Sequence, residues 1–317
     1  MQPWTRRMML RAAAGSGLAT LLPFTPVRGQ AVSKRQQKGL TLGFGTYGTR
    51  GMKTEVAIKL LAEIGYDAVE LTATEGWDAE PQKMPKARRA AIRRQIDQSG
   101  LELASLMENL RPTGEKAAQE KNVRRLREAA ELAHDLSPQQ PPVIQTVLGG
   151  KNWDQSRQLF LDRLEKWSEV ARSTKTIIAI KPHRGGAMSE PREAAWLIEQ
   201  LGKNSSIQMC YDYSHYAFRD LDLKETIRTA LPHLAHVAVK DAMQKEGKVT
   251  FVLPGEAGTI DYVTLLKTLV AGGYRGDICC EVSSAVWRQP QYDAIVAAKA
   301  CYRNMAAVFK KAGISRS

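Results

Sequence analysis

The sequence predicts an α/β protein folded as a closed (β/α)8 TIM barrel. Two observations lead to this prediction: short apolar runs alternate with helical patterns, and most of these runs are apolar on both faces. Strands of that kind are buried on both sides, as in a parallel sheet whose outer face is covered by helices. Eight strand–helix units fit within about 275 residues, a size typical of such barrels.

An open doubly wound sheet is the alternative arrangement for these units. Such sheets often carry a glycine-rich dinucleotide loop after the first strand. The segment "GFGTYG" at that place lacks the G-x-G-x-x-G register. The barrel is therefore favoured, and we expect no nucleotide cofactor.

The first four units run from residue 39 to residue 172. Apolar runs predict strands at "GLTLGFGTY" (39–47), "YDAVELTA" (66–73), "LELASLM" (101–107) and "PPVIQTVLG" (141–149). Apolar residues at helical spacing predict helices at 54–65, 86–99, 115–134 and 153–172. Gly65 suits the end of the first of these helices.

The last four units follow the same alternation. Strands are predicted at "KTIIAIKPH" (175–183), "SIQMCYDYSH" (206–215), "LAHVAVKD" (234–241) and "GDICCEVSS" (276–284). Helices are predicted at 191–202, after Leu223, at 261–271 and at 292–312, and Pro191 and Gly202 suit a helix start and end. No helix or strand is predicted for the segment "AMQKEGKVTFVLPGEAG" (242–258) that follows the seventh strand.

The first 31 residues are expected to form a twin-arginine-type signal peptide outside the fold. Arg6 and Arg7 precede an apolar stretch at 12–24, and small residues such as Gly29 and Ala31 follow it. The stretch is shorter than the roughly 20 residues that span a bilayer. We expect an exported, periplasmic protein with no membrane span, whose barrel covers residues 39–313; the alternative is a disordered basic terminus.

Charge and cysteine content narrow the protein's class only slightly. The formal charge is +13, from 46 basic and 33 acidic residues, which favours anionic partners or forms a solvated basic surface. The four cysteines show no C-x-x-C spacing. In a chain of this size they are expected to be small buried residues rather than a disulfide framework.

Candidate functional residues follow the predicted strands. In such barrels the site is built at the carboxyl ends of the strands. Three of the five histidines, several carboxylates and two lysines fall there, which indicates a functional site. The polar residues expected at this rim are Glu70, Glu108, Gln145, Lys181, His183, Arg184, Asp212, His215, His236, Lys240 and Glu281.

Three of these residues indicate specific chemistry. Asp212 and His215 form a D-x-x-H pair that could share a metal, or in which one side chain orients the other as a base. A capping aspartate and a loop histidine are the alternative. Glu281 ends an apolar strand, so its charge requires a metal or a cation such as Lys181 or Lys240.

Five segments together resemble the xylose isomerase-like TIM-barrel superfamily, many of whose members are sugar phosphate isomerases or epimerases. In chain order they are "GYDAVEL", "YDYSH", "HVAVKD", "LPGEAGTIDY" and "GGYRGDICCEVS". The resemblance implies a metal site formed by Glu of strand five, Asp of D-x-x-H, His of an H-x-K-D pattern, and Glu of strand eight. Asp212 and Glu281 match this pattern, whereas Lys181 and Ala238 stand where the glutamate and the histidine are usual.

The departure at Lys181 leaves two interpretations open. Its ammonium could replace the charge of the metal, or a lowered pKa could make Lys181 a base or a Schiff-base former. Alternatively, a divalent Mn, Mg, Co or Zn ion could be held in a shifted geometry. The proposed metal ligands are then Asp212, His236 and Glu281; the proposed catalytic residues are Lys181, His183, His215 and Lys240; the proposed substrate-binding residues are Glu70, Arg184 and Glu256.

The leading hypothesis is an exported sugar isomerase or epimerase that moves a proton next to the carbonyl of a sugar or keto-sugar. A keto-glycoside lyase and a non-catalytic sugar-binding barrel are the alternatives. A metal-dependent nuclease is disfavoured because the sequence lacks a histidine-rich cluster, so no nucleic-acid partner is expected. The sequence leaves the sugar and the oligomeric state open.

Overall fold

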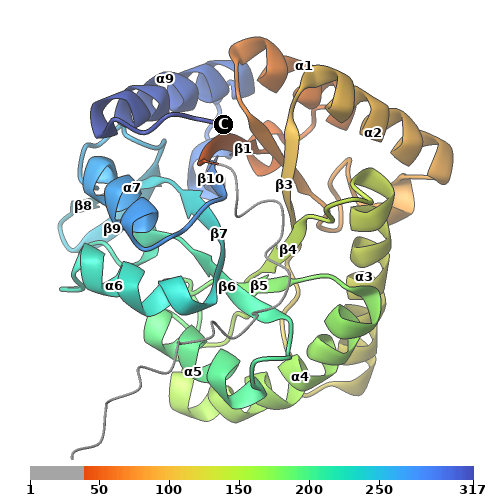
Figure 1. Ribbon diagram of the computed structural model, residues 1–317. Coiled ribbons are helices and arrows are strands. Elements are labelled where there is room, and N and C mark those ends of the chain that lie inside the picture. The colour runs from red at the N-terminus through yellow and green to blue at the C-terminus, as the bar shows by residue number, and fades with distance from the viewer. Residues whose placement is uncertain (1–38) are drawn as a thin grey trace, which may run out of the picture. The chain divides into compact units, whose positions relative to one another are not determined.

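The structure is a computed structural model that describes residues 39–317. Its eight parallel strands form a closed barrel in the order β1-β10-β7-β6-β5-β4-β3-β2, and helices surround the strands (Figure 1). This arrangement confirms the predicted (β/α)8 TIM barrel. The predicted signal peptide at residues 1–31 lies outside the described residues.

The barrel strands are short, and each lies within its predicted run. Their bounds are β1 (Thr41–Gly45), β2 (Ala68–Thr72), β3 (Glu102–Met107), β4 (Val143–Thr146), β5 (Ile178–Ile180), β6 (Ile207–Tyr211), β7 (Leu234–Val239) and β10 (Asp277–Cys280). The polar residues after each strand therefore come to lie at one end of the barrel, as predicted.

The outer helices agree closely with their predicted ranges. Their bounds are α1 (Thr54–Ile64), α2 (Lys86–Ser99), α3 (Lys116–Leu136), α4 (Trp153–Thr174), α5 (Pro191–Leu201), α6 (Leu223–Ala230), α7 (Tyr262–Ala271) and α9 (Ala294–Ala312). Gly65 ends α1 with a positive φ of 102°, which is costly for other residues. Pro191 opens α5 within a capping box formed by Glu190 and Glu193.

The excursion after β7 is a β-hairpin that the sequence analysis did not predict. Its strands are β8 (Asp241–Lys245) and β9 (Lys248–Val252), which pair antiparallel. Both turn residues, Glu246 and Gly247, have positive φ, as a tight hairpin turn requires. A short helix, α8 (Ser284–Trp287), was also not predicted.

The barrel interior is filled in layers by side chains from alternating positions of the strands. Val143, Ala179, Cys210 and Ala238 form one small apolar cluster of this interior. Two residues after Ala179 and Ala238, on the same faces of β5 and β7, come Lys181 and Lys240. On these faces of β5 and β7, an apolar alanine is therefore followed by a charged lysine at the carboxyl end.

The cysteines behave as predicted from their spacing. All four are buried and free of disulfide bonds. Within residues 39–317, none of the helices combines the length and the apolar character needed to cross a bilayer.

Candidate active site

A cavity of about 590 Å³ opens at the carboxyl ends of the barrel strands. Its inner wall is formed by residues from the ends of five strands: Glu108, Gln145, Lys181, His183, Lys240 and Glu281. Tyr47, Trp77, Arg111, Lys151 and Phe251 also line it. The cavity is large enough for a small ligand and combines apolar surface with converging polar groups, as binding sites usually do.

Two lysines and two carboxylates form the lysine–carboxylate cluster, which consists of Lys181, Asp212, Lys240 and Glu281. The Lys240 ammonium contacts the Asp212 carboxylate and lies 2.9 Å from Glu281 Oε1. The Lys181 ammonium contacts the other carboxylate oxygen of Glu281. All four side chains are buried, so each charge depends on its partners for stabilisation.

The pairing keeps Glu281 and Lys181 charged. Burial would raise the pKa of Glu281, but the Lys181 and Lys240 charges together hold that pKa well below its usual range. Burial would likewise lower the pKa of Lys181, but the Glu281 carboxylate outweighs it and raises that pKa. Lys181 is therefore an ammonium at neutral pH, which disfavours the amine-base role considered for it from the sequence.

His183 and His215 pack beside the cluster with ring centroids 4.1 Å apart. His215 is fully buried, and its Nε2 lies 3.1 Å from Lys240 Nζ. Burial and the Lys240 charge lower the pKa of His215 well below its ordinary value. Burial, followed by the charges of Lys240 and Lys181, lowers the pKa of His183 to about 4. Both rings are therefore neutral at physiological pH.

Glu108 lines the cavity directly after β3 and is 2% exposed. Arg125 of α3 donates to its Oε1 at 2.7 Å, and Arg125 also lies 3.5 Å from Glu80. Burial raises the pKa of Glu108 to about 7, although Arg125 opposes that shift. The sequence placed Glu108 at the rim without a role, and its position at the end of an apolar strand was the available signal.

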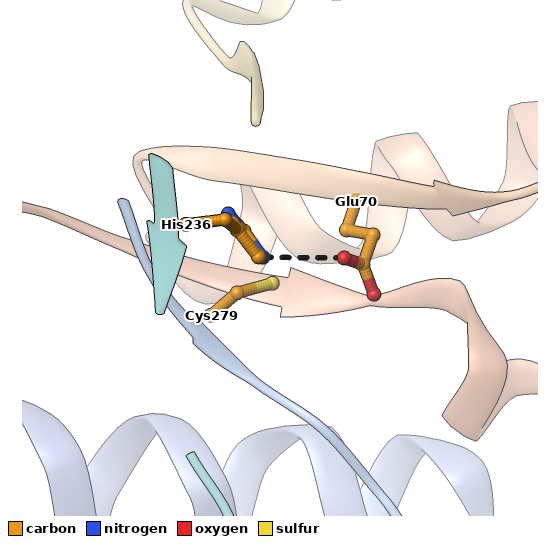
Figure 2. A group of neighbouring side chains, drawn as sticks. All are labelled: Glu70, His236 and Cys279. Atoms are coloured by element: carbon orange, nitrogen blue, oxygen red, sulfur yellow. Dashed lines mark ion pairs between the residues drawn. The ribbon is translucent and has the colours of Figure 1, made fainter. Parts of the chain in front are cut away.

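A second polar group, the inner network, lies within the barrel; it consists of Glu70, Ser105, Gln145, His236 and Cys279. Glu70 Oε2 accepts hydrogen bonds from the Ser105 hydroxyl and from Gln145 Nε2 at 2.9 Å. His236 Nε2 lies 3.2 Å from the same carboxylate oxygen, with Cys279 beside the pair (Figure 2).

The inner network contains a possible metal site. The ligand atoms of Glu70, His236 and Cys279 all lie within 4.8 Å of one another, and no other described residues form such a group of three. His236 thus joins Glu70 rather than Asp212 and Glu281, so the three metal ligands proposed from the sequence are not gathered into one group.

The substrate-binding residues proposed from the sequence do not line the cavity. Glu70 belongs to the inner network. Arg184 donates to the carbonyl of Ala217. Glu256 is exposed, and its carboxylate accepts from the backbone N–H of Leu253 at 2.9 Å.

The structure instead brings aromatic and basic side chains to the cavity. The rings of Tyr47 and Trp77 stack with centroids 5.2 Å apart. Phe251, from the unpredicted hairpin, lies 5.1 Å from Lys240 Nζ measured to the ring centroid. Tyr47 lies in a short 3-10 helix (Thr46–Thr49) after β1, Trp77 in the segment between β2 and α2, and Phe251 in the hairpin. The sequence analysis did not identify any of the three as cavity residues.

The lysine–carboxylate cluster does not fit the divalent metal site that the resemblance implies. Each carboxylate that would bind the ion already carries an ammonium, and an ammonium repels a cation. The thiol, imidazole and carboxylate of the inner network are donors that suit Zn²⁺ better. Glu70, however, already accepts two hydrogen bonds there and lies 3.2 Å from His236 Nε2.

Comparison with known proteins supports the fold and identifies the family. The sequence pattern of the family described as "Xylose isomerase-like TIM barrel" matches residues 58–305. "Putative hydroxypyruvate isomerase" of Mus musculus is 31% identical over 94 residues, which are 30% of this chain and 31% of that protein. The matched region thus spans about a third of the length of this relative.

Solved structures of similar fold include a 3-keto-D-glucoside 4-epimerase from E. coli, with a TM-score of 0.65 and 14% identity over 86% of this chain and 99% of that one. The IOLI protein, solved with a bound zinc atom, has a TM-score of 0.69 and 14% identity over 86% of this chain and 98% of that one. The chain belongs to the xylose isomerase-like TIM barrel family.

Proposed function

We propose that this protein is an isomerase or epimerase that moves a proton at the carbon next to the carbonyl of a keto-sugar or a related hydroxy-ketone. The names of its relatives support isomerase chemistry in general. The cavity supports it more specifically, because it combines fixed positive charge, a neutral imidazole and a buried carboxyl group.

The two buried ammoniums are the observation that carries the proposal. Removal of a proton next to a carbonyl leaves an enediolate, whose negative charge must be stabilised. In the cavity wall, Lys181 and Lys240 present positive charge that the carboxylates behind them hold in position. Preorganised donors of this kind contribute on the order of 10²- to 10³-fold each to the rate. We propose that an enediolate oxygen binds at the Lys181 ammonium. The ammonium of Lys240 already contacts Asp212, His215 and Glu281, so it contributes through its charge.

The proposed reaction at this cavity does not depend on a divalent ion. The same initial proton removal would also begin β-elimination from a keto-glycoside, so the identity of the product separates an isomerase from a lyase. A non-catalytic sugar-binding barrel would bind the same ligands without exchanging their protons.

The test is proton exchange between substrate and solvent. Purified protein is incubated in D2O with a panel of keto-sugars, free aldoses and hydroxypyruvate, with EDTA or with added Mn²⁺, Mg²⁺, Co²⁺ or Zn²⁺, and followed by NMR. We expect deuterium at the carbon next to the carbonyl in at least one compound, unaffected by EDTA. Binding without exchange across the whole panel would favour the sugar-binding barrel.

We also propose that the protein is exported to the periplasm through the twin-arginine segment at its N-terminus. Replacing Arg6 and Arg7 together by lysine should retain the protein in the cytoplasmic fraction. Unchanged distribution between the fractions would contradict this proposal.

A further inference from the structure

We propose that Glu108 is the catalytic base that removes the substrate proton, and that His183 donates a hydrogen bond to the carbonyl oxygen as a neutral imidazole. This inference rests on the proposed function and assigns its proton-transfer group. Neither residue belongs to the lysine–carboxylate cluster or to the inner network.

The choice of base follows from the carboxylates that reach the cavity. Among the described residues only Glu108 and Glu281 line it with a carboxylate. Both oxygens of Glu281 contact ammoniums, whose charges outweigh burial and hold its pKa well below its usual range, so it is a weak base. Glu108 is different, because Arg125 binds Oε1 whereas Oε2 has only a 3.3 Å hydrogen bond from the Asn109 backbone.

The surroundings of Glu108 suit a group that exchanges protons near neutral pH. The charged groups facing it are Arg125 from α3 and, behind Arg125, Glu80 from the segment between β2 and α2. The neighbouring strands contribute uncharged Thr74 and Gln145 to the same wall. Burial raises the pKa of Glu108 to about 7, because the Arg125 charge opposes the effect of burial only in part. This value is near the optimum for a base that must also return its proton.

His183 complements this base as a hydrogen-bond donor. Its Nδ1 accepts a hydrogen bond from the Gly185 backbone N–H at 3.1 Å, which leaves the proton of the neutral ring on Nε2. Lys181 and Lys240 oppose protonation of the ring. A base of glutamate type paired with a neutral imidazole is an established combination for enediolate chemistry.

The proposed step conserves atoms and electrons. Glu108 takes the proton from the carbon next to the carbonyl, and the electrons of that C–H bond form the carbon–carbon double bond of the enediolate. The carbonyl π electrons move to oxygen, where the His183 Nε2–H and the ammoniums stabilise the charge. The hydroxyl proton of the enediolate then passes to the adjacent former carbonyl oxygen as the hydroxyl oxygen becomes the new carbonyl. Protonated Glu108 gives its proton to the neighbouring carbon, whose new C–H bond takes the electrons of the carbon–carbon double bond.

This geometry favours isomerisation over epimerisation. One carboxyl group on one wall can carry a proton between adjacent carbons on the same face of the enediolate. Inversion at a single carbon needs an acid and a base on opposite faces, and Glu281, the other carboxylate of the cavity, is held by two lysines. The expected substrate class is therefore an aldose–ketose pair or an equivalent hydroxy-carbonyl pair.

Glu108→Gln is the decisive variant, and Glu80→Gln is its matched control. Glu80 contacts the same Arg125 but does not line the cavity. In the D2O assay we expect Glu108→Gln to slow substrate exchange by about 10³-fold, within the range for loss of a general base. Glu80→Gln should stay within about threefold of the wild type, and both variants should bind the substrate in calorimetry.

The pH profile tests the same assignment through Arg125. In the wild type, kcat/KM should rise with pH through a pKa near 7, and Arg125→Gln should move that rise to higher pH because a compensating charge is lost. An unshifted rise, or exchange that persists in Glu108→Gln, would overturn the role of Glu108. Absence of exchange in the wild type on every substrate would instead overturn the proposed function.

Discussion

Two polar groups inside one barrel, the lysine–carboxylate cluster and the inner network, differ in the kind of interaction that satisfies them. The inner network joins one carboxylate to a hydroxyl, an amide and an imidazole. The cluster sets two ammoniums against two carboxylates, and Lys181, Lys240 and Glu281 also face the cavity. Only the uncharged Gln145 of the inner network lines the cavity, whereas the cluster presents charge to a ligand that enters it.

This difference indicates which buried polar group is the better candidate for a functional role. Burying charges costs desolvation free energy that their mutual attraction seldom exceeds, so a buried ion-pair cluster is weak evidence for a stabilising role. Its position on a cavity wall, with shifted pKa values beside it, is typical of a functional site. The inner network has the features of a support, because Gln145 connects Glu70 to the cavity wall.

The largest effect is expected from Lys240→Met, which removes one charge and leaves its partners buried. We expect a loss of about 3–5 kcal/mol in the free energy of unfolding, since Asp212 loses its cation. Activity should fall by at least about 10²-fold. Urea unfolding and turnover measure the two effects, and Lys240→Met/Asp212→Asn should recover part of the stability but not the activity. Full stability in the single variant would contradict the charge pairing.

A smaller and different effect is expected from Glu70→Gln in the inner network. The amide presents a donor where the carboxylate accepted hydrogen bonds, so we expect about 1–3 kcal/mol of destabilisation. Because Glu70 does not line the cavity, kcat should stay within a few fold of the wild type. Unfolding curves and turnover of the same preparation test this; a collapse of kcat with stability intact would give the inner network a direct catalytic role.

The pH dependence of stability separates the histidines from Glu108. His183 has a folded pKa of about 4, so it gains a proton on unfolding between about pH 4 and 6.5. The free energy of unfolding therefore falls on acidification through that window. His215, whose pKa is also lowered, contributes in the same direction. Glu108 acts oppositely, because its folded pKa of about 7 lies above the unfolded value of about 4.3.

Glu108→Gln removes the opposing contribution. Between about pH 5 and 6 its free energy of unfolding should therefore rise with pH more steeply than that of the wild type, by up to about 1.4 kcal/mol per pH unit. Urea unfolding at several pH values provides the slopes. Equal slopes would mean that Glu108 titrates normally in the folded protein.

The smallest effect is expected from metal removal. Dialysis against EDTA should change neither Tm nor turnover, because ammoniums occupy the carboxylates of the cluster and hydrogen bonds occupy Glu70. Elemental analysis before and after dialysis accompanies the measurement. A different result would place an ion in the inner network: stoichiometric zinc in the purified protein, and a Tm that falls on chelation in the wild type but not in Cys279→Ser.

The sequence by itself determined the barrel and the rim. Alternating apolar runs and helical spacings are local properties, and the residue after a buried strand must lie at the barrel's end, so Lys181, Asp212, Lys240 and Glu281 were found. A pairing of Glu281 with Lys181 or Lys240 could also be expected from the sequence, because a charge at the end of an apolar strand requires a counter-charge.

Only the tertiary structure decided which rim residues face the cavity. Strand register places His236 against Glu70, away from the cluster. The hairpin brings in Phe251, and α3 supplies the arginine behind Glu108. These contacts join residues far apart in the chain. Whether each side chain reaches the cavity depends on strand register and loop conformation. A linear pattern encodes strands and helices but not those distances.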